Sequence, residues 1–151
     1  MAQRTESQTT ARIIFPMRIV LDTNCLIQCL SSHSAFFAVW ESFLNGQNTL
    51  CVTTDILYEY REILPHFFST ELSEAIVNTI VNAPFVVHVN PTYRFNLIQT
   101  DPDDNKIVDC AIIAGARYVV TNDHHFNILR EISFPIVQII SIKDFVSLIS
   151  R

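Results

Sequence analysis

The stretch MRIVLDTN, residues 17–24, decides the fold, because it joins an apolar run directly to Asp22, Thr23 and Asn24. An unbroken run of branched aliphatic residues predicts a strand that is buried on both faces. Asp22 therefore stands at the carboxyl end of a buried strand. Two interpretations follow: Asp22 caps the next helix, or it joins other acids at the edge of a sheet.

Strands and helices alternate along the rest of the chain. Aliphatic runs predict further strands at residues 49–53, 84–89, 117–121 and 135–140. Apolar residues at helical spacing predict helices at residues 23–30, 34–47, 54–64, 69–83, 103–116, 124–129 and 141–150. Buried strands separated by helices are typical of a parallel sheet covered on both faces. We therefore predict an α/β fold, a three-layer α/β/α sandwich with a central parallel sheet.

The length and the composition indicate one folded domain. The chain has 151 residues, of which 49% are apolar and 17% are charged, and it contains only two glycines. This composition is typical of a globular domain and excludes a disordered chain. The first residues are polar and without pattern, so we expect a mobile N-terminal extension over residues 1–12 and a single domain over residues 13–151.

The charge and the cysteines limit the possible partners and compartments. The formal net charge is −5, and the eight arginines and two lysines form no basic run. A basic stripe that would grip nucleic acid through its phosphates is thus absent, and any contact to nucleic acid must be local. The four cysteines form no CxxC pair, and no segment resembles a signal peptide or a membrane span. We expect a cytoplasmic protein without a membrane partner.

Four acidic residues are predicted to meet at one edge of the sheet. Asp22 and Asp123 follow two buried strands, and Glu59 lies in the first turns of the helix after another strand. Asp104 lies at the start of the helix that precedes the strand at 117–121. Asp22 and Asp123, each taken alone, are explained equally well as helix caps. Asp104 alone is better explained as a helix cap, and Glu59 alone as a solvated helix residue. Independent caps, however, have no reason to fall together on the edge where such sheets bind ligands.

Two of these positions have competitors nearby. Asp104 continues the apolar row of its helix, which includes Ile107, so it is predicted to face the sheet. Asp109 is the alternative third acid, but it falls off this row and is predicted to face solvent. Glu62 is the alternative to Glu59. The helical phase favours Asp104 for the third position.

Carboxylates that converge in this way repel one another, so they retain protons or bind a cation. Oxygen ligands favour Mg²⁺ or Mn²⁺ over Zn²⁺. Such a cation can activate a water and stabilise the attacking and leaving oxygens of a phosphodiester. His124 and His125 have no partner at the spacing of a zinc site and are interpreted as loop residues. Thr23, Asn24 and Thr121 are interpreted as hydrogen-bond donors to the carboxylates.

Four motifs resemble, in order and spacing, the successive motifs of the PIN domain: VLDTNCLI (20–27), LYEYREIL (57–64), DPDDNKIVDCAIIAGARYVVTND (101–123) and VQIISIKDF (137–145). The resemblance covers residues 17–147 and is most evident to the VapC-like toxins of bacterial toxin–antitoxin systems. It implies a Rossmann-like α/β/α fold and a Mg²⁺- or Mn²⁺-dependent endoribonuclease. By position it implies the metal ligands Asp22, Glu59, Asp104 and Asp123, with Asn24 and Thr121 beside them in the catalytic site.

The same resemblance implies an RNA substrate, an antitoxin protein that neutralises the enzyme, and a homodimer. Two other functions remain open. A phosphatase with Asp22 as nucleophile is disfavoured, because DTN lacks the second aspartate, two residues on, that serves as general acid. A catalytically silent module would keep the fold and bind a basic peptide or protein at the same acidic edge.

Overall fold

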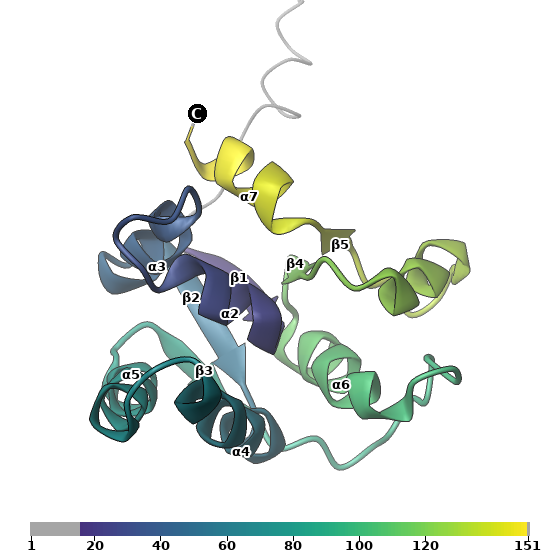
Figure 1. Ribbon diagram of the computed structural model, residues 1–151. Helices are drawn as coiled ribbons and strands as arrows, with labels where there is room; N and C mark the ends of the chain where they lie inside the picture. Colours follow the sequence, from purple (N-terminus) through teal and green to yellow (C-terminus); the bar gives the residue numbers. More distant parts are fainter. Residues whose placement is uncertain (1–15, 151) are drawn as a thin grey trace, which may run out of the picture.

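The computed structural model describes residues 16–150, and its centre is a five-stranded sheet (Figure 1). All neighbouring strands pair in parallel, in the order β3-β2-β1-β4-β5. The strands are β1 (Met17–Leu21), β2 (Asn48–Val52), β3 (Val86–His88), β4 (Tyr118–Val120) and β5 (Ile139–Ile140). The predicted α/β fold with a central parallel sheet is confirmed. The extension predicted at residues 1–12 lies outside the described residues.

Helices connect the strands and cover the sheet. They are α2 (Thr23–Cys29), α3 (Phe37–Leu44), α4 (Thr54–Ile63), α5 (Thr70–Asn82), α6 (Asn105–Ala114) and α7 (Ile142–Ile149), with short 3₁₀ helices η1 (Leu64–His66), η2 (Pro102–Asp104) and η3 (His124–Glu131). α3 and α7 lie together on one side of the sheet, and α6 covers β1, β2 and β4 from the other side (Figure 1). The three predicted layers are present.

One predicted strand is much shorter than expected. Aliphatic residues predict a strand over 135–140, but only Ile139–Ile140 pair with β4. β5 is an edge strand, and Pro135 has no backbone donor for a ladder. The residues before Ile139 therefore run as a loop, in which Phe134 and Ile136 are exposed.

The helix boundaries follow from local hydrogen bonding. Thr53, Ser69 and Ser141 each accept, through the side-chain oxygen, a hydrogen bond from a backbone N–H in the first turn of the following helix. These are the residues that stabilise helix N-termini best. Gly115 ends α6 with a φ of 65°, a left-handed conformation that glycine adopts without strain.

The strand register brings three strand ends to one level. Leu21 of β1 is paired with Val120 of β4, and Ile19 of β1 is paired with Leu50 of β2. β1, β2 and β4 therefore end side by side. The backbone N–H of Asp22 continues the ladder and donates to the Val120 carbonyl at 3.1 Å. The polar residues after each strand consequently lie along a single edge.

A buried hydrogen bond joins α4 to this edge. The Tyr60 hydroxyl donates to the Leu21 carbonyl at 2.5 Å, and the Tyr60 side chain is fully buried. Burial raises the pKa of Tyr60 well above its ordinary value, so the hydroxyl stays protonated and remains a donor. The bond places the neighbouring Glu59 beside the end of β1.

No helix in the described part of the chain has the length and the apolar character that crossing a membrane requires.

We expect Tyr60→Phe to lower the free energy of unfolding by about 1 kcal/mol, because the buried Leu21 carbonyl loses its donor. Urea unfolding measures this change. Tyr58→Phe is the matched control, since Tyr58 lies on the same helix and is 62% exposed; we expect its midpoint to equal that of the wild type. An unchanged midpoint in Tyr60→Phe would contradict the proposed link between α4 and β1.

Candidate metal centre

A cavity of about 480 Å³ opens at the carboxyl edge of the sheet. The four predicted acids all line it, although they come from distant segments of the chain. They are Asp22 after β1, Glu59 on α4, Asp104 in η2 and Asp123 before η3. Asn24 and Lys106 line the same cavity. The structure thus brings the predicted acids to one place.

Asp22 has both of the roles that its sequence position suggested. One carboxylate oxygen accepts from the Thr23 backbone N–H at 2.8 Å, which caps α2. The other oxygen accepts from the Thr121 hydroxyl at 2.8 Å, across the sheet. Burial raises the pKa of Asp22, the hydrogen bonds from Thr121 and Thr23 oppose this rise, and the charges of Glu59 and Asp123 add to it. Asp22 is therefore a cap and also a wall of the cavity.

Glu59 is held by two partners of different kinds. It accepts a short hydrogen bond from the Thr23 hydroxyl, and its other oxygen lies 2.6 Å from the Lys106 ammonium. Burial alone would lower the pKa of Lys106, but the hydrogen bond and the charge of Glu59 outweigh it and raise that pKa. The Glu59 carboxylate is thus partly neutralised within the chain. The alternative residue, Glu62, lines the same cavity from an exposed position.

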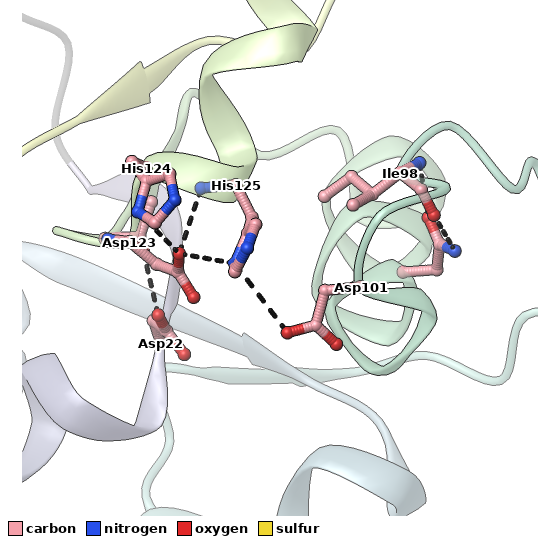
Figure 2. Close-up of polar contacts among 8 residues, drawn as sticks. Asp22, Ile98, Asp101, Asp123, His124 and His125 are labelled. Atoms are coloured by element: carbon pink, nitrogen blue, oxygen red, sulfur yellow. Dashed lines mark hydrogen bonds and ion pairs between the residues drawn. The ribbon is translucent and has the colours of Figure 1, made fainter.

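Asp123 is tied to its own turn and to Thr121. Its backbone N–H donates to the Thr121 hydroxyl oxygen at 3.0 Å, and its carboxylate accepts from the His125 backbone N–H at 2.9 Å. The His125 ring turns back toward the same carboxylate, so that Nδ1 lies 2.9 Å from Asp123 and 3.7 Å from Asp101 (Figure 2). His125 therefore lies between two carboxylates.

Asp104 is the least compensated of these acids. Its Oδ2 atom is buried and has no hydrogen-bond partner. Burial raises the pKa of Asp104 to about 7, with further increases from the charges of Asp101, Asp123 and Asp22 and a decrease from His125. A buried carboxylate oxygen without a partner is what a bound cation would satisfy.

The cluster around Asp104 can supply a set of metal ligands. Asp101, Asp104, Asp123 and His125 each offer one ligand atom, and these four atoms lie within 4.8 Å of one another. Carboxylate oxygens with one imidazole nitrogen suit Mn²⁺, and carboxylates also suit Mg²⁺. The residues present therefore fit a divalent cation.

The prediction that Asp109 faces solvent is wrong. Asp109 is only 3% exposed, and its carboxylate accepts from the Phe95 backbone N–H at 3.1 Å. The segment between β3 and η2 passes over this face of α6 and covers it. Asn105 fastens the same segment, since its side chain exchanges two hydrogen bonds of 2.8 Å with the backbone of Ile98. Asp109 thus holds a loop in place and does not line the cavity of Asp22.

Two residues outside the predicted set of ligands, Asp101 and His125, also join the cluster. The segment between β3 and η2 carries Asp101, and Figure 2 shows its carboxylate turned toward the His125 ring. His125, interpreted from the sequence as a loop residue, reaches the cluster because the carboxylate of Asp123 accepts from the His125 backbone and closes a tight turn. The local signal for this turn is Asp123 itself, whose side chain caps η3. His124 points outward and is 82% exposed.

A comparison with known protein families gives a match over most of the chain. The family model of the PIN domain matches residues 18–125. No curated protein matches the chain.

Several solved structures share the fold. VapBC2 from Rickettsia felis, bound to a DNA fragment from its promoter, has a chain with 17% identity and a TM-score of 0.58, covering 83% of this chain and 98% of that chain. VapBC-1 from nontypeable Haemophilus influenzae has a chain with 16% identity and a TM-score of 0.58, and the match covers 84% of this chain and 99% of that chain. The PIN domain endonuclease Utp24 has 19% identity and a TM-score of 0.50, and the match covers 83% of this chain and 85% of that chain. At these identities the likeness concerns the fold.

We expect Asp104→Asn to make the metal-free protein more stable than the wild type at pH 8, but not at pH 4. The pKa of Asp104 is about 7 in the folded protein, above its ordinary value of 3.8. The folded state therefore holds the proton more tightly than the unfolded state, and the wild type loses stability as the pH rises through this window. Thermal unfolding in EDTA between pH 4 and pH 8 measures the difference.

Asp103→Asn is the control for this comparison, because Asp103 is an exposed carboxyl of the same turn. We expect its melting temperature to follow that of the wild type across the same pH range. A wild type that is at least as stable as Asp104→Asn at pH 8 would show that Asp104 is not a strained carboxylate.

Proposed function

We propose that this chain, which belongs to the PIN domain family, is a divalent-metal-dependent endoribonuclease. Its reaction would be the hydrolysis of RNA phosphodiester bonds. The observation that carries the proposal is the convergence of Asp22, Glu59, Asp104 and Asp123 on one cavity. Carboxylates by themselves repel a phosphodiester, so a site built from them needs a cation to accept such a substrate. Asp104 and Asp123, with Asp101 and His125 close by, would hold that cation, and Asp22 would complete its ligands from the same cavity.

Neighbouring side chains hold the carboxylates of the site in position. Thr121 donates to Asp22 and accepts from the Asp123 backbone, so one hydroxyl sets the relative position of two acids. Thr23 and Lys106 hold Glu59 at the opposite wall. When bound, Mg²⁺ or Mn²⁺ supplies positive charge that lowers the pKa of water and stabilises the charge developing on the phosphate oxygens. Among the residues that line this cavity in the described part of the chain, there is no cysteine or serine nucleophile.

We further propose that the chain is the toxin of a toxin–antitoxin pair, forms a homodimer and works in the cytoplasm. The support for a partner protein is the likeness to VapBC structures, whose names denote two-component assemblies. The support for a reducing compartment is that all four cysteines are buried and unpaired. A silent binding module and a phosphatase that uses Asp22 are the alternatives that the following experiment separates.

We expect Mn²⁺ to raise the melting temperature of the wild type and to enable cleavage of a random-sequence RNA pool, with EDTA abolishing both effects. Binding to the folded state alone stabilises it by about 2.7 kcal/mol at a hundredfold excess over Kd. Asp22→Asn and Asp123→Asn should lose cleavage and most of the Mn²⁺ effect. Asp144→Asn is the control, because this exposed carboxylate lies on α7 and does not line the cavity.

A wild type that binds Mn²⁺ but leaves RNA intact would favour the silent module. Phosphorylation of Asp22 during turnover would favour the phosphatase. RNA cleavage that persists in both aspartate variants would contradict the proposed site.

We expect Thr121→Val to weaken Mn²⁺ binding by about tenfold or more, because Asp22 loses a donor that orients it. Thr121→Ser keeps the hydroxyl and should restore the affinity. Both values come from the Mn²⁺ concentration that gives half of the maximal shift in melting temperature. Equal affinity in Thr121→Val and wild type would mean that Thr121 is only a packing residue.

A further inference from the structure

A second cavity, of about 360 Å³, adjoins the acidic cavity and shares Asp22, Asn24 and Asp123 with it. We propose that this second cavity is a subsite for an unpaired nucleobase of the RNA strand, next to the phosphate that is cleaved. The proposal rests on the proposed function, because it identifies the bound base as part of an RNA strand whose phosphate lies at the acids. It is argued from the cavity's apolar wall, its amide groups and its charge.

The apolar wall consists of Phe67 and Ile27. Phe67 is 60% exposed, whereas the next residue, Phe68, packs against the hydrophobic core. η1 ends at His66, and the Phe67 backbone N–H donates to the Leu64 carbonyl at 2.9 Å, which fixes the backbone of this turn. An exposed aromatic side chain at the mouth of a polar site offers a face on which a base can stack.

Amide groups line the rest of this cavity. Asn24, Gln28 and Asn122 line the cavity with neutral donors and acceptors. The Asn122 amide is oriented from two sides: its oxygen accepts from the Ile142 backbone N–H at 3.2 Å, and its nitrogen donates to Gln28 Oε1 at 3.4 Å. Because Gln28 uses its oxygen in this contact, its amide nitrogen is left to donate to a ligand. Fixed side-chain amides of this kind read the polar edges of bases.

The charge of the cavity disfavours a phosphate, and its aromatic face and amides favour a base over a basic peptide. None of its lining residues in the described part of the chain is positively charged, whereas Asp22 and Asp123 are acidic, so the cavity has no counter-charge for a phosphate. The whole chain has a formal net charge of −5, which leaves little general attraction for an RNA backbone. Contacts to an uncharged base can then orient the RNA strand, which contacts to its phosphates do not do here. A basic peptide would be drawn to the acids, but it would leave the aromatic face and the amides unused.

The first test titrates the protein with adenosine, cytidine, guanosine and uridine, without metal. Nucleosides are uncharged, so neither cation binding nor catalysis enters the measurement. Two-dimensional NMR follows the side-chain amide signals of Gln28 and Asn122. We expect saturable shifts with at least one nucleoside, and an affinity about tenfold lower or weaker still in Phe67→Ala. Phe134→Ala is the matched control, because Phe134 is 86% exposed and lies in the loop before β5; it should bind as the wild type does.

The second test sequences the products of a random RNA pool cleaved with Mn²⁺. The wild type and Phe134→Ala should share a preference for one nucleotide beside the cut, and Phe67→Ala should lose that preference. Wild-type cleavage with an unchanged preference in Phe67→Ala would overturn the subsite and leave the nuclease standing. Nucleoside binding that depends on Phe67, without any RNA cleavage, would overturn the nuclease and leave the subsite standing. Failure of every nucleoside to bind, with or without capture of an arginine-rich peptide at the same amides, would overturn the subsite.

Discussion

The arrangement depends on the parallel register that ends β1, β2 and β4 at one level. The residues that follow each strand lie at the same edge of the sheet. Carboxylates from segments that are far apart in the sequence therefore meet there. Hydrogen bonds then set their positions: the Thr121 hydroxyl, after β4, reaches Asp22, after β1, at 2.8 Å. The buried Tyr60 hydroxyl adds α4 to the same edge. A change in register by one residue would redirect every one of these side chains.

The acids at this edge are compensated to different degrees, and this difference has a chemical use. Glu59 has an internal counter-ion in Lys106, and Asp22 has two hydrogen-bond donors. Asp104 has a buried oxygen without a partner, and its pKa is raised to about 7. Burying this Asp104 oxygen without a partner costs free energy of folding. A cation bound among Asp104 and its neighbours would relieve that cost, which couples metal binding to stability.

The two adjoining cavities divide recognition in the proposed nuclease. The acidic cavity suits a cation and the phosphate attached to it, whereas the second cavity, which shares Asp22 and Asp123 with it, offers Phe67 and side-chain amides to a base. In a chain with a net charge of −5, general attraction for RNA is weak, and specific contacts have to replace it. The same acidity is compatible with a basic partner protein at the site.

The sequence by itself determined the order of the strands along the chain, though not the length of β5. It also determined most helix boundaries, the parallel sheet and the edge to which Asp22, Glu59, Asp104 and Asp123 belong. These features follow from aliphatic runs, helical spacing and caps such as Thr53, all of which are local. Tertiary structure alone decided that Asp109 is buried, that Asp101 and His125 join the cluster, that Lys106 pairs with Glu59, and that Phe67 and Gln28 line one cavity. The physical reason is that the segment between β3 and η2 has no periodic pattern. Its path over α6 is set by hydrogen bonds between residues far apart in the chain, such as Phe95 with Asp109.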